Sequence, residues 1–483
     1  MAGLVGISTA EHSEFVETGL KLVRHRGGAG QSICSLDHAV LGQVWPRAHE
    51  CFAAGAGDYP AALDGEIHNW TEMSAGSICP LEAIATAYDN RGPEFVSDID
   101  GPFALAIATS DTIFLARDSV GKSPLYLGTN NGTVCFASEM KALFDFEGDI
   151  SEFRPGHYWT PGTGFVRFAD ISPQETVSHS ADEVAEELRS RLVASVMKRV
   201  TGGEVGAWLS GGIDSASLTA LARRQLPRLK TFAVGVEDAP DLEYARAVSA
   251  FVDTEHHERI CALPEMLAVL PAVIYHLESF DALLVRSSIT NFLVGRLASD
   301  HVPAVLSGEG GDELFGGYAY LKDLEPSELP EELVDITKRL HNTALQRVDR
   351  CSASHGLVAR TAFLDQDVLD YALQIPPSMK VHGDSVKVEK WILRRAMDGL
   401  LPEEVLTRTK AKFWQGAGVG EQLHAHAEEM ISEAEFAAER DLGDGVVLNT
   451  KEELLYYRIF KSLFGSDVDA TLVGRTKGAS VEA

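Results

Sequence analysis

Short apolar runs separated by Gly and Pro dominate the first 170 residues of the chain. These β-type runs cover residues 39–43, 112–116, 133–138 and 158–160. Apolar runs of this length, bounded by turn residues, are typical of strands. Helical spacing interrupts them near residues 13–23 and 80–88. The pattern predicts a sheet-rich first domain over residues 1–170, with helices packed on its sheets.

The pattern changes after residues 171–180, an aperiodic stretch that we interpret as an interdomain linker. Ser180 and Glu183 then form a capping-box pattern, and the apolar residues that follow have helical spacing. Next come an apolar run at 205–209, a glycine turn, a helical stretch to residue 224 and a second apolar run at 229–236. This order of strand, loop, helix and strand is the βαβ unit of a parallel α/β domain.

We expect this second domain to extend over residues 181–464. Most segments from residue 264 onward have helical spacing, except the apolar run 304–306 and the glycine loop after it. Residues 465–483 are small and polar, so we expect a mobile tail there. The predicted fold class is thus an α+β sandwich domain followed by an α/β domain.

The net charge of the chain limits the kinds of partner that it can bind. Its 483 residues include 42 Lys and Arg against 71 Asp and Glu, a formal net charge of −29. Such a chain binds nucleic acid or anionic membranes poorly, so a polyanion such as ATP must be held locally by backbone amides, a few cations and metal ions. No apolar run reaches 18 residues and no signal peptide is evident, so we expect a cytoplasmic protein. A homodimer is one assembly that the sequence allows.

The strongest chemical signal is the segment LSGGIDS at residues 209–215. A glycine turn from a strand into a helix presents consecutive backbone N–H groups to an anion. Ser210 and Ser215 add hydroxyl donors, whereas Asp214 would repel phosphate and is better explained as a magnesium ligand. A plain βα turn with an N-cap is the alternative, and the combination of residues favours the anion site.

Two further segments point to the same chemistry. The segment LSGEGGDELFGGY at residues 306–318 again follows an apolar run, and it contains Glu309, Asp312 and Glu313. These acids could lie on a solvated turn, but their crowding favours a metal-binding edge at which Asp312 pairs with Asp214. The segment RTKAKF at residues 408–413 would be a surface patch on its own; beside ATP, a lysine there could stabilise developing negative charge.

Taken together, the chain resembles the glutamine-dependent asparagine synthetases over nearly its full length. The matching segments keep the family's order and spacing: SGGIDS at 210–215, IYHLESFD at 274–281, SGEGGDELFGGY at 307–318, FLDQDVLD at 363–370, EKWILR at 389–394 and RTKAKF at 408–413. The resemblance implies an N-terminal Ntn-hydrolase-like sandwich domain and a PP-loop (adenine nucleotide α-hydrolase-like) synthetase domain. It also implies an enzyme that adenylates a carboxylic acid with ATP and then transfers the acyl group to an amine.

The resemblance also assigns site residues. It places pyrophosphate on Ser210, Gly211, Gly212 and Ser215. It places adenine against Leu209, Val234, Ser307 and Gly308. It implies Mg²⁺ on Asp214 and Asp312 and makes Lys410 the catalytic lysine. We add Glu309 and Asp312 to the predicted catalytic set.

The first domain departs from the family at the residues needed for glutamine hydrolysis. The nucleophilic cysteine is replaced by Ala2, whose methyl group cannot attack an amide. By our alignment, Trp45 replaces the arginine that holds the glutamine carboxylate, Asp64 replaces an oxyanion-hole asparagine and Ile78 replaces an aspartate that holds the amine. We therefore expect an inactive glutaminase domain that is kept for structural support; a redeployed pocket is the alternative.

The acid-binding segment has changed as well. The family segment DVTTIRAS reads DALLVRSS at residues 281–288, so Leu283 and Leu284 replace two threonines while Arg286 is kept and could pair with a carboxylate. Drift outside the pocket is one explanation. The other is that the substrate is an acid other than aspartate.

The sequence therefore predicts an ATP-dependent amide-forming ligase that uses free ammonia or another amine without glutamine hydrolysis, in specialised metabolism. Its partners would be a small carboxylic acid and an amine. Three alternatives remain: an intramolecular, β-lactam-type ring closure, an ammonia-dependent asparagine synthetase, and a non-catalytic nucleotide-binding protein. Retention of Asp214, Asp312 and Lys410 argues against the last.

Overall fold

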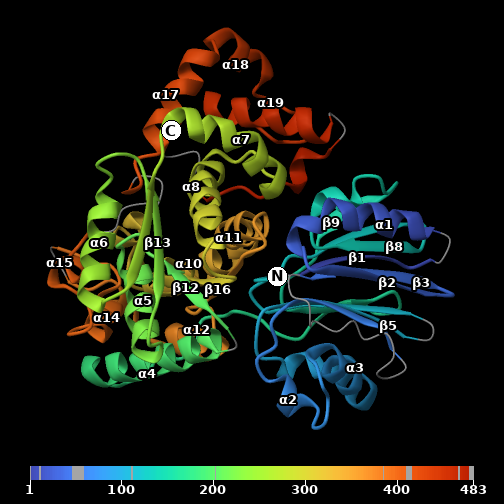
Figure 1. Cartoon of the computed structure of the whole chain (residues 1–483), viewed down its shortest axis with the longest axis horizontal. Coiled ribbons are helices and arrows are strands. Elements are labelled where there is room, and N and C mark those ends of the chain that lie inside the picture. Colours follow the sequence, from blue (N-terminus) through green and yellow to red (C-terminus); the bar gives the residue numbers. More distant parts are fainter. Residues whose placement is uncertain are drawn as a thin grey trace. The chain divides into compact units, whose positions relative to one another are not determined.

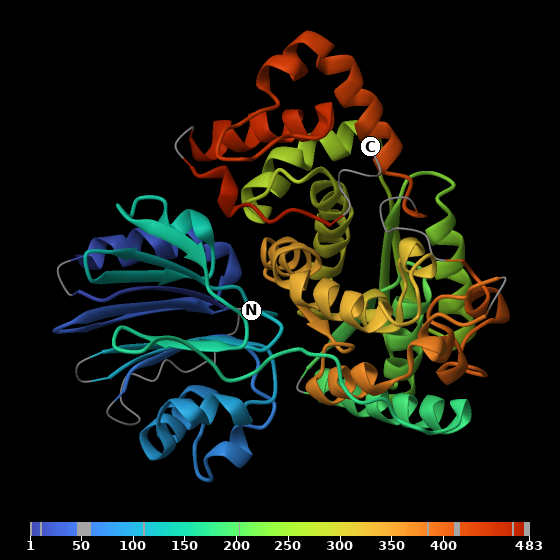
Figure 2. The same ribbon diagram turned by 180° about the vertical axis from the view of Figure 1, so that it is seen from behind.

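A computed structural model describes residues 2–9, 12–45, 59–109, 112–201, 203–383, 386–409, 416–465 and 468–477. The chain divides into two compact units, whose elements are labelled in Figure 1 and shown from behind in Figure 2. Unit 1 comprises Met1–Ile171, Ala353–Gly356 and Ser466–Leu472. Unit 2 comprises Ser172–Ser352, Leu357–Gly465 and Val473–Ala483.

Unit 1 contains two antiparallel sheets. The six-stranded sheet has the order β2-β3-β1-β8-β7-β9, with bounds Gly30–Leu36, Ala39–Trp45, Gly3–Ile7, Thr133–Ala137, Tyr126–Asn130 and Asp149–Glu152. The five-stranded sheet has the order β11-β10-β6-β5-β4, with bounds Gly164–Arg167, His157–Thr160, Ile113–Arg117, Phe103–Ala108 and Ala61–Gly65.

Apolar side chains from the two sheets face each other and form one buried layer. Leu4 and Leu41 of the first sheet belong to the same core cluster as Ala104 and Leu115 of the second. Helix α1 (Ser13–Leu22) covers the outer face of the first sheet and α3 (Pro80–Arg91) that of the second. The short helix α2 (Trp70–Met73) precedes α3. Unit 1 is thus a helix–sheet–sheet–helix sandwich.

Unit 2 is built around a five-stranded parallel sheet with the order β14-β13-β12-β15-β16. The strands are Glu255–Ile260, Lys230–Gly235, Val205–Trp208, Ala304–Ser307 and Val358–Thr361. Buried on both faces, β12 and β15 consist almost entirely of apolar residues, as expected for central parallel strands. Strand order reverses between β12 and β15, which makes their carboxyl ends the topological switch point of the sheet.

Helices surround this sheet. The helices that precede β15 in the chain are α4 (Ala181–Val200), α5 (Ile213–Gln225), α6 (Pro240–Val252), α7 (Leu263–Leu277) and α8 (Ala282–Ser299). The later ones are α9 (Gly311–Phe315), α10 (Leu329–Lys338), α11 (Ala344–Ala353), α12 (Gln366–Gln374), α13 (Pro377–Lys380), α14 (Trp391–Ala396), α15 (Glu403–Leu406), α17 (Gly420–Met430), α18 (Glu433–Glu439) and α19 (Lys451–Phe464). Right-handed crossovers place α5 and α6 on one face of the sheet and α8 on the other.

No single helix among the described residues is long and apolar enough to cross a membrane. Within the same residues, only α7 and α8 taken together have that length and composition, and they are bent by 109° at the break between them.

The end of the chain is better anchored than its composition suggests. We expected a mobile tail over residues 465–483, but within it the Thr476 hydroxyl donates to Asp281 at 2.8 Å and Arg475 lies 2.5 Å from Glu453. Lys477 pairs with Glu332 at 2.8 Å. Arg475, Thr476 and Lys477 thus anchor this part of the tail through specific contacts that the local sequence pattern does not predict.

Candidate functional site

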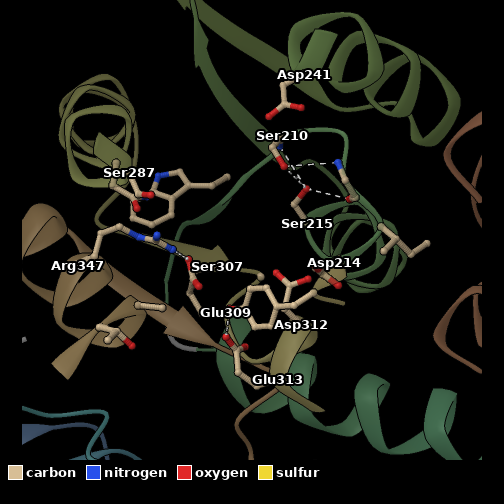
Figure 3. A pocket seen from close by; sticks show the side chains of 18 of the residues that line it. Ser210, Asp214, Ser215, Asp241, Ser287, Ser307, Glu309, Asp312, Glu313 and Arg347 are labelled. Carbon is tan, nitrogen blue, oxygen red and sulfur yellow. Dashed lines mark hydrogen bonds and ion pairs between the residues drawn. The ribbon is translucent and has the colours of Figure 1, made fainter. Parts of the chain in front are cut away.

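The glycine loops that follow β12 and β15 meet at the switch point of the unit 2 sheet. Parallel strands end at the same edge, so Asp214 after β12 and Asp312 after β15 come together although 98 residues separate them in the chain. Figure 3 shows these two carboxylates next to each other, with Ser210 on the neighbouring loop and Ser215 in the first turn of α5. This edge is where ligands bind in open α/β sheets.

The first loop has the geometry of an anion site. Gly211 adopts a positive φ of 71°, and a Cβ there would lie 2.3 Å from Cβ of Tyr244, so only glycine fits. The Ser210 backbone N–H donates to Oγ of Ser215 at 3.2 Å, which draws the loop around the start of α5. The 13-residue helix α5 directs its first N–H groups and the positive end of its dipole at this loop.

A buried lysine links the two carboxylates. The Nζ atom of Lys390 lies 2.5 Å from Oδ2 of Asp214 and 2.5 Å from Oδ1 of Asp312, and its side chain is fully buried. Lys390 itself has a φ of 55° at the start of α14, a left-handed conformation that costs energy in a residue with a side chain and that often marks a functional site. Sequence reasoning missed Lys390, which lies in the EKWILR segment quoted for its resemblance alone.

The carboxylate pair fits a magnesium ion. An ammonium group already occupies the position between the two acids, so the site attracts a cation. Glycines keep this space open, since a Cβ on Gly311 would lie 2.5 Å from Oδ1 of Asp214 and one on Gly317 would lie 1.9 Å from Oδ1 of Asp312. The described ranges contain no group of three or more His, Cys, Asp or Glu placed to bind a metal. Two carboxylates completed by phosphate oxygens and waters are the usual coordination of Mg²⁺ beside a nucleotide.

Two further acids of the second loop have protein partners. Glu309 accepts a hydrogen bond of 2.6 Å from Arg347 on α11. Glu313 accepts one from the Tyr318 hydroxyl, and burial together with the charge of Asp312 raises the pKa of Glu313 to about 7. The loop therefore presents one arginine-paired carboxylate and one carboxyl group whose pKa is raised to near neutral pH.

A cavity of about 660 Å³ opens at this edge of the sheet. It is lined by most of the residues that the sequence predicted for the site: Leu209, Ser210, Gly212, Asp214, Ser215, Val234, Leu283, Leu284, Ser307, Gly308, Glu309 and Asp312. Gly211 and Arg286 are not among the lining residues, and Lys410 lies outside the residues that the structure describes. The sequence did not single out Arg347, Arg408, Tyr318 or Asn291, which also line the cavity.

Arg286 occupies a different environment from the predicted one. Its Nε atom lies 2.8 Å from both carboxylate oxygens of Glu452 on α19, and Glu452 also accepts a 2.6 Å hydrogen bond from Tyr456. The guanidinium fork is thus occupied by a carboxylate of the chain itself, 166 residues away. We expected Arg286 to hold a substrate carboxylate, but its guanidinium group is paired with Glu452. The local sequence pattern could not predict this pairing, because the two residues lie far apart in the chain.

Comparison with known proteins identifies both units. The asparagine synthase family profile matches residues 187–334 and 325–480, and the glutamine amidotransferase domain profile matches residues 1–154. Asparagine synthetase [glutamine-hydrolyzing] 2 of Oryza sativa subsp. japonica is 33% identical over 96% of this chain and 84% of its own length. Asparagine synthetase B [glutamine-hydrolyzing] of Escherichia coli is 33% identical over 92% of this chain and 87% of its own.

We predict that Asp214→Asn or Asp312→Asn nearly abolishes pyrophosphate release from ATP while the fold is kept. The loss of one carboxylate weakens binding of Mg²⁺, and a single electrostatic group of this kind accounts for about 3 kcal/mol, or two to three decades in rate. Pyrophosphate release is measured by a coupled assay and the fold by circular dichroism. Asp367→Asn, at a side chain that is 67% exposed, is the control. Near-normal turnover of either site variant would show that the carboxylates bind no metal.

We also predict that Arg286→Met destabilises the protein without changing its affinity for the acid. Removing one partner of a buried ion pair leaves Glu452 uncompensated, which costs about 3–5 kcal/mol. Chemical denaturation measures the stability, and the concentration of acid at half-maximal pyrophosphate exchange measures the affinity. The double variant Arg286→Met, Glu452→Gln should recover part of the stability. A folded, stable Arg286→Met protein with weakened acid binding would restore the substrate-binding role.

Proposed function

The chain belongs to the asparagine synthetase family of ATP-dependent carbon–nitrogen ligases, and from that premise we propose that it joins a carboxylic acid other than aspartate to free ammonia or another amine. The resemblance seen in the sequence is confirmed, as are its two fold types, an Ntn-type domain and a PP-loop synthetase domain. The proposal departs from the glutamine-hydrolysing relatives in the nitrogen source and in the acid.

The adenylation step follows from the arrangement at the switch point. The backbone N–H groups and hydroxyls of residues 210–215 would hold the β- and γ-phosphates of ATP. An acid carboxylate oxygen attacks the α-phosphorus, the bond to the bridging oxygen breaks, and pyrophosphate leaves with the electron pair. Mg²⁺, bound by Asp214 and Asp312, would neutralise the charge that develops on that leaving group. Lys390 holds the two carboxylates at a fixed separation before the nucleotide arrives.

The amide forms in the second step. The amine nitrogen attacks the carbonyl carbon of the acyl adenylate, loses a proton, and AMP leaves with the oxygen of the former carboxylate. Positioning and charge stabilisation matter more here than proton transfer, because AMP is already a good leaving group. We assign the stabilisation of the phosphate charge to Lys410, on the basis of the RTKAKF segment. The Glu309–Arg347 pair would orient the reacting groups, since both residues line the cavity.

The absence of glutamine hydrolysis is supported by the surroundings of Ala2 in unit 1. The Ala2 backbone nitrogen donates to Asp64 at 2.9 Å, and Nη2 of Arg26 lies 2.8 Å from the same carboxylate. Arg26 also contacts Glu139 at 3.0 Å, and all three charged side chains are fully buried. A carboxylate beside the nucleophile position would repel the oxyanion of a tetrahedral intermediate. Among the residues described there, Arg26 is paired with the carboxylates of Asp64 and Glu139.

The choice of acid rests on the wall of the cavity at the start of α8. Leu283 and Leu284 line this wall in place of two hydroxyl-bearing residues of the family segment. An apolar wall leaves polar groups of a bound aspartate without partners, which disfavours that substrate. An acid with an apolar or aromatic part would bury its surface against the leucines instead.

One observation carries the proposal: Asp214 and Asp312 meet beside the anion loop in a cavity large enough for a nucleotide and a second small molecule. ATP–pyrophosphate exchange tests it directly, because exchange requires a reversible adenylation of the acid. Exchange that depends on an added acid supports the proposal, and its absence across a broad acid panel would refute it.

The first prediction from this function is that Ala2→Cys does not restore glutaminase activity. The new thiol would lie beside the Asp64 carboxylate, and Trp45 and Ile78 would remain in place of the substrate-binding groups. The measurement is glutamate release from glutamine, with the Escherichia coli relative as the positive control. Glutamate release by the single variant above the wild-type background would overturn the inactive-domain assignment.

The second prediction is that L-aspartate is a poor substrate. Exchange should be faster by tenfold or more, about 1.4 kcal/mol, with an acid that has a less polar side chain. The panel consists of amino acids, dicarboxylates and aromatic acids at equal concentration. If aspartate supports the fastest exchange and ammonia then gives asparagine, the protein is an ammonia-dependent asparagine synthetase.

A further inference from the structure

The ammonium group of Lys390 contacts the two carboxylates from inside the protein, on the side away from the cavity. The side chain of Lys390 has no exposed surface, whereas those of Asp214 and Asp312 are 12% and 18% exposed. Both carboxylates line the cavity, and Lys390 is not among the residues described as lining it. A ligand that enters the cavity therefore meets the carboxylates first and the lysine charge behind them.

The chain around Lys390 confines its ammonium group to this position. The Lys390 backbone N–H donates to the Phe315 carbonyl of α9 at 3.2 Å, and the Lys390 carbonyl accepts from the Arg394 N–H at 2.9 Å. A Cβ on Gly317 would lie only 2.3 Å from Cε of Lys390, so the backbone at Gly317 passes close against the end of the lysine stem. Because its backbone and its stem are both held, Lys390 has little room to move away when a second cation approaches.

A lysine that stays in place changes the charge that a metal ion meets. Lys390 contacts one oxygen of each carboxylate, Oδ2 of Asp214 and Oδ1 of Asp312. An ammonium group balances one of the two negative charges of an ionised pair, and it also repels a divalent cation across a short distance with little water to screen it. The carboxylates with their lysine should therefore hold a divalent cation weakly while the cavity contains no nucleotide.

We propose that Lys390 is a positioning residue that makes metal binding at Asp214 and Asp312 depend on the nucleotide. The phosphates of ATP on the loop at residues 210–215 would add the negative charge and the oxygen ligands that the pair lacks beside its lysine. By reducing the charge of the pair, the same lysine would lower its repulsion of an incoming triphosphate. The inference rests on the proposed use of ATP and Mg²⁺ and adds the residue that couples their binding.

The test measures metal binding without any acid, so it is independent of which acid is the substrate. Mn²⁺ suits the same oxygen ligands as Mg²⁺, and the free ion is counted by its electron paramagnetic resonance signal. Titrations are made with and without α,β-methylene-ATP. The variant is Lys390→Met, which keeps an unbranched side chain and removes the charge.

Lys451→Met is the matched control. Lys451 also bridges two carboxylates, with Nζ 2.8 Å from Glu428 and 2.7 Å from Glu433, and its side chain is only 9% exposed. None of these three residues is among those described as lining the cavity. The control therefore removes a lysine from a pair of acids without altering the proposed metal site.

We expect Lys390→Met to bind Mn²⁺ alone about tenfold or more tightly than the wild type does, because the repelling charge is gone. The analogue should raise the Mn²⁺ affinity of the wild type by about tenfold or more, and that of Lys390→Met by a smaller factor. Lys451→Met should match the wild type in both titrations. The double variant Lys390→Met, Asp312→Asn should lose the gain, because it has one carboxylate fewer.

The same substitution also makes a prediction about folding. Without Lys390 the two carboxylates are uncompensated, so Lys390→Met should be less stable than the wild type in metal-free buffer. Mn²⁺ should raise its unfolding temperature more than that of the wild type, since a ligand that binds the folded state stabilises it. If the variant is unfolded in metal-free buffer, circular dichroism should show that Mn²⁺ restores the fold. A variant that stays unfolded with Mn²⁺ would show that Lys390 is purely structural.

Mn²⁺ binding by Lys390→Met that is equal to or weaker than that of the wild type would overturn the role of Lys390. If the analogue still raised the Mn²⁺ affinity of the wild type, the proposed metal site would stand. A wild-type protein that binds no Mn²⁺ even with the analogue would overturn both this inference and the metal site of the proposed function.

Discussion

Electrostatic repulsion between two closely placed carboxylates is the constraint on which the catalytic unit depends. The parallel order of β12 and β15 brings Asp214 and Asp312 to one edge of the sheet, where like charges cannot stay together without a cation. Lys390 supplies that cation from a strained position at the start of α14. The glycines of both loops then make sense as spacers, because any side chain would fill the space around the carboxylates.

Two clusters of charged side chains, one in each unit, differ in how their charges are paired. In unit 1, Arg26, Asp64, Glu139 and Lys141 pair with one another next to Ala2. In unit 2, Asp214 and Asp312 line an open cavity and share Lys390 as their cationic partner. A self-satisfied network stabilises a fold without needing a ligand, whereas carboxylates gathered at a cavity attract Mg²⁺ and phosphate. This contrast supports a structural first unit and a catalytic second one.

Local pattern was enough to predict the β12–loop–α5 unit and the carboxylate pair, because glycine turns and apolar strands are encoded by adjacent residues. The surroundings of Asn291 and the tail contacts of Thr476 could not be predicted from local pattern, because both depend on residues far away in the chain. Arg286 shows the same limit, because its partner Glu452 lies 166 residues later. A family motif indicates which residues are kept, and only the packed structure indicates which of them face the ligand.

The central claim is that the acid is activated by transfer of AMP to its carboxylate. It is tested most directly with ¹⁸O in the carboxyl group of an acid that supports exchange, followed through one turnover with ammonia. The account predicts that ¹⁸O appears in AMP and none in pyrophosphate, because the carboxylate oxygen attacks the α-phosphorus and leaves with AMP. Amide formation with unlabelled AMP, or with the label in inorganic phosphate, would contradict it.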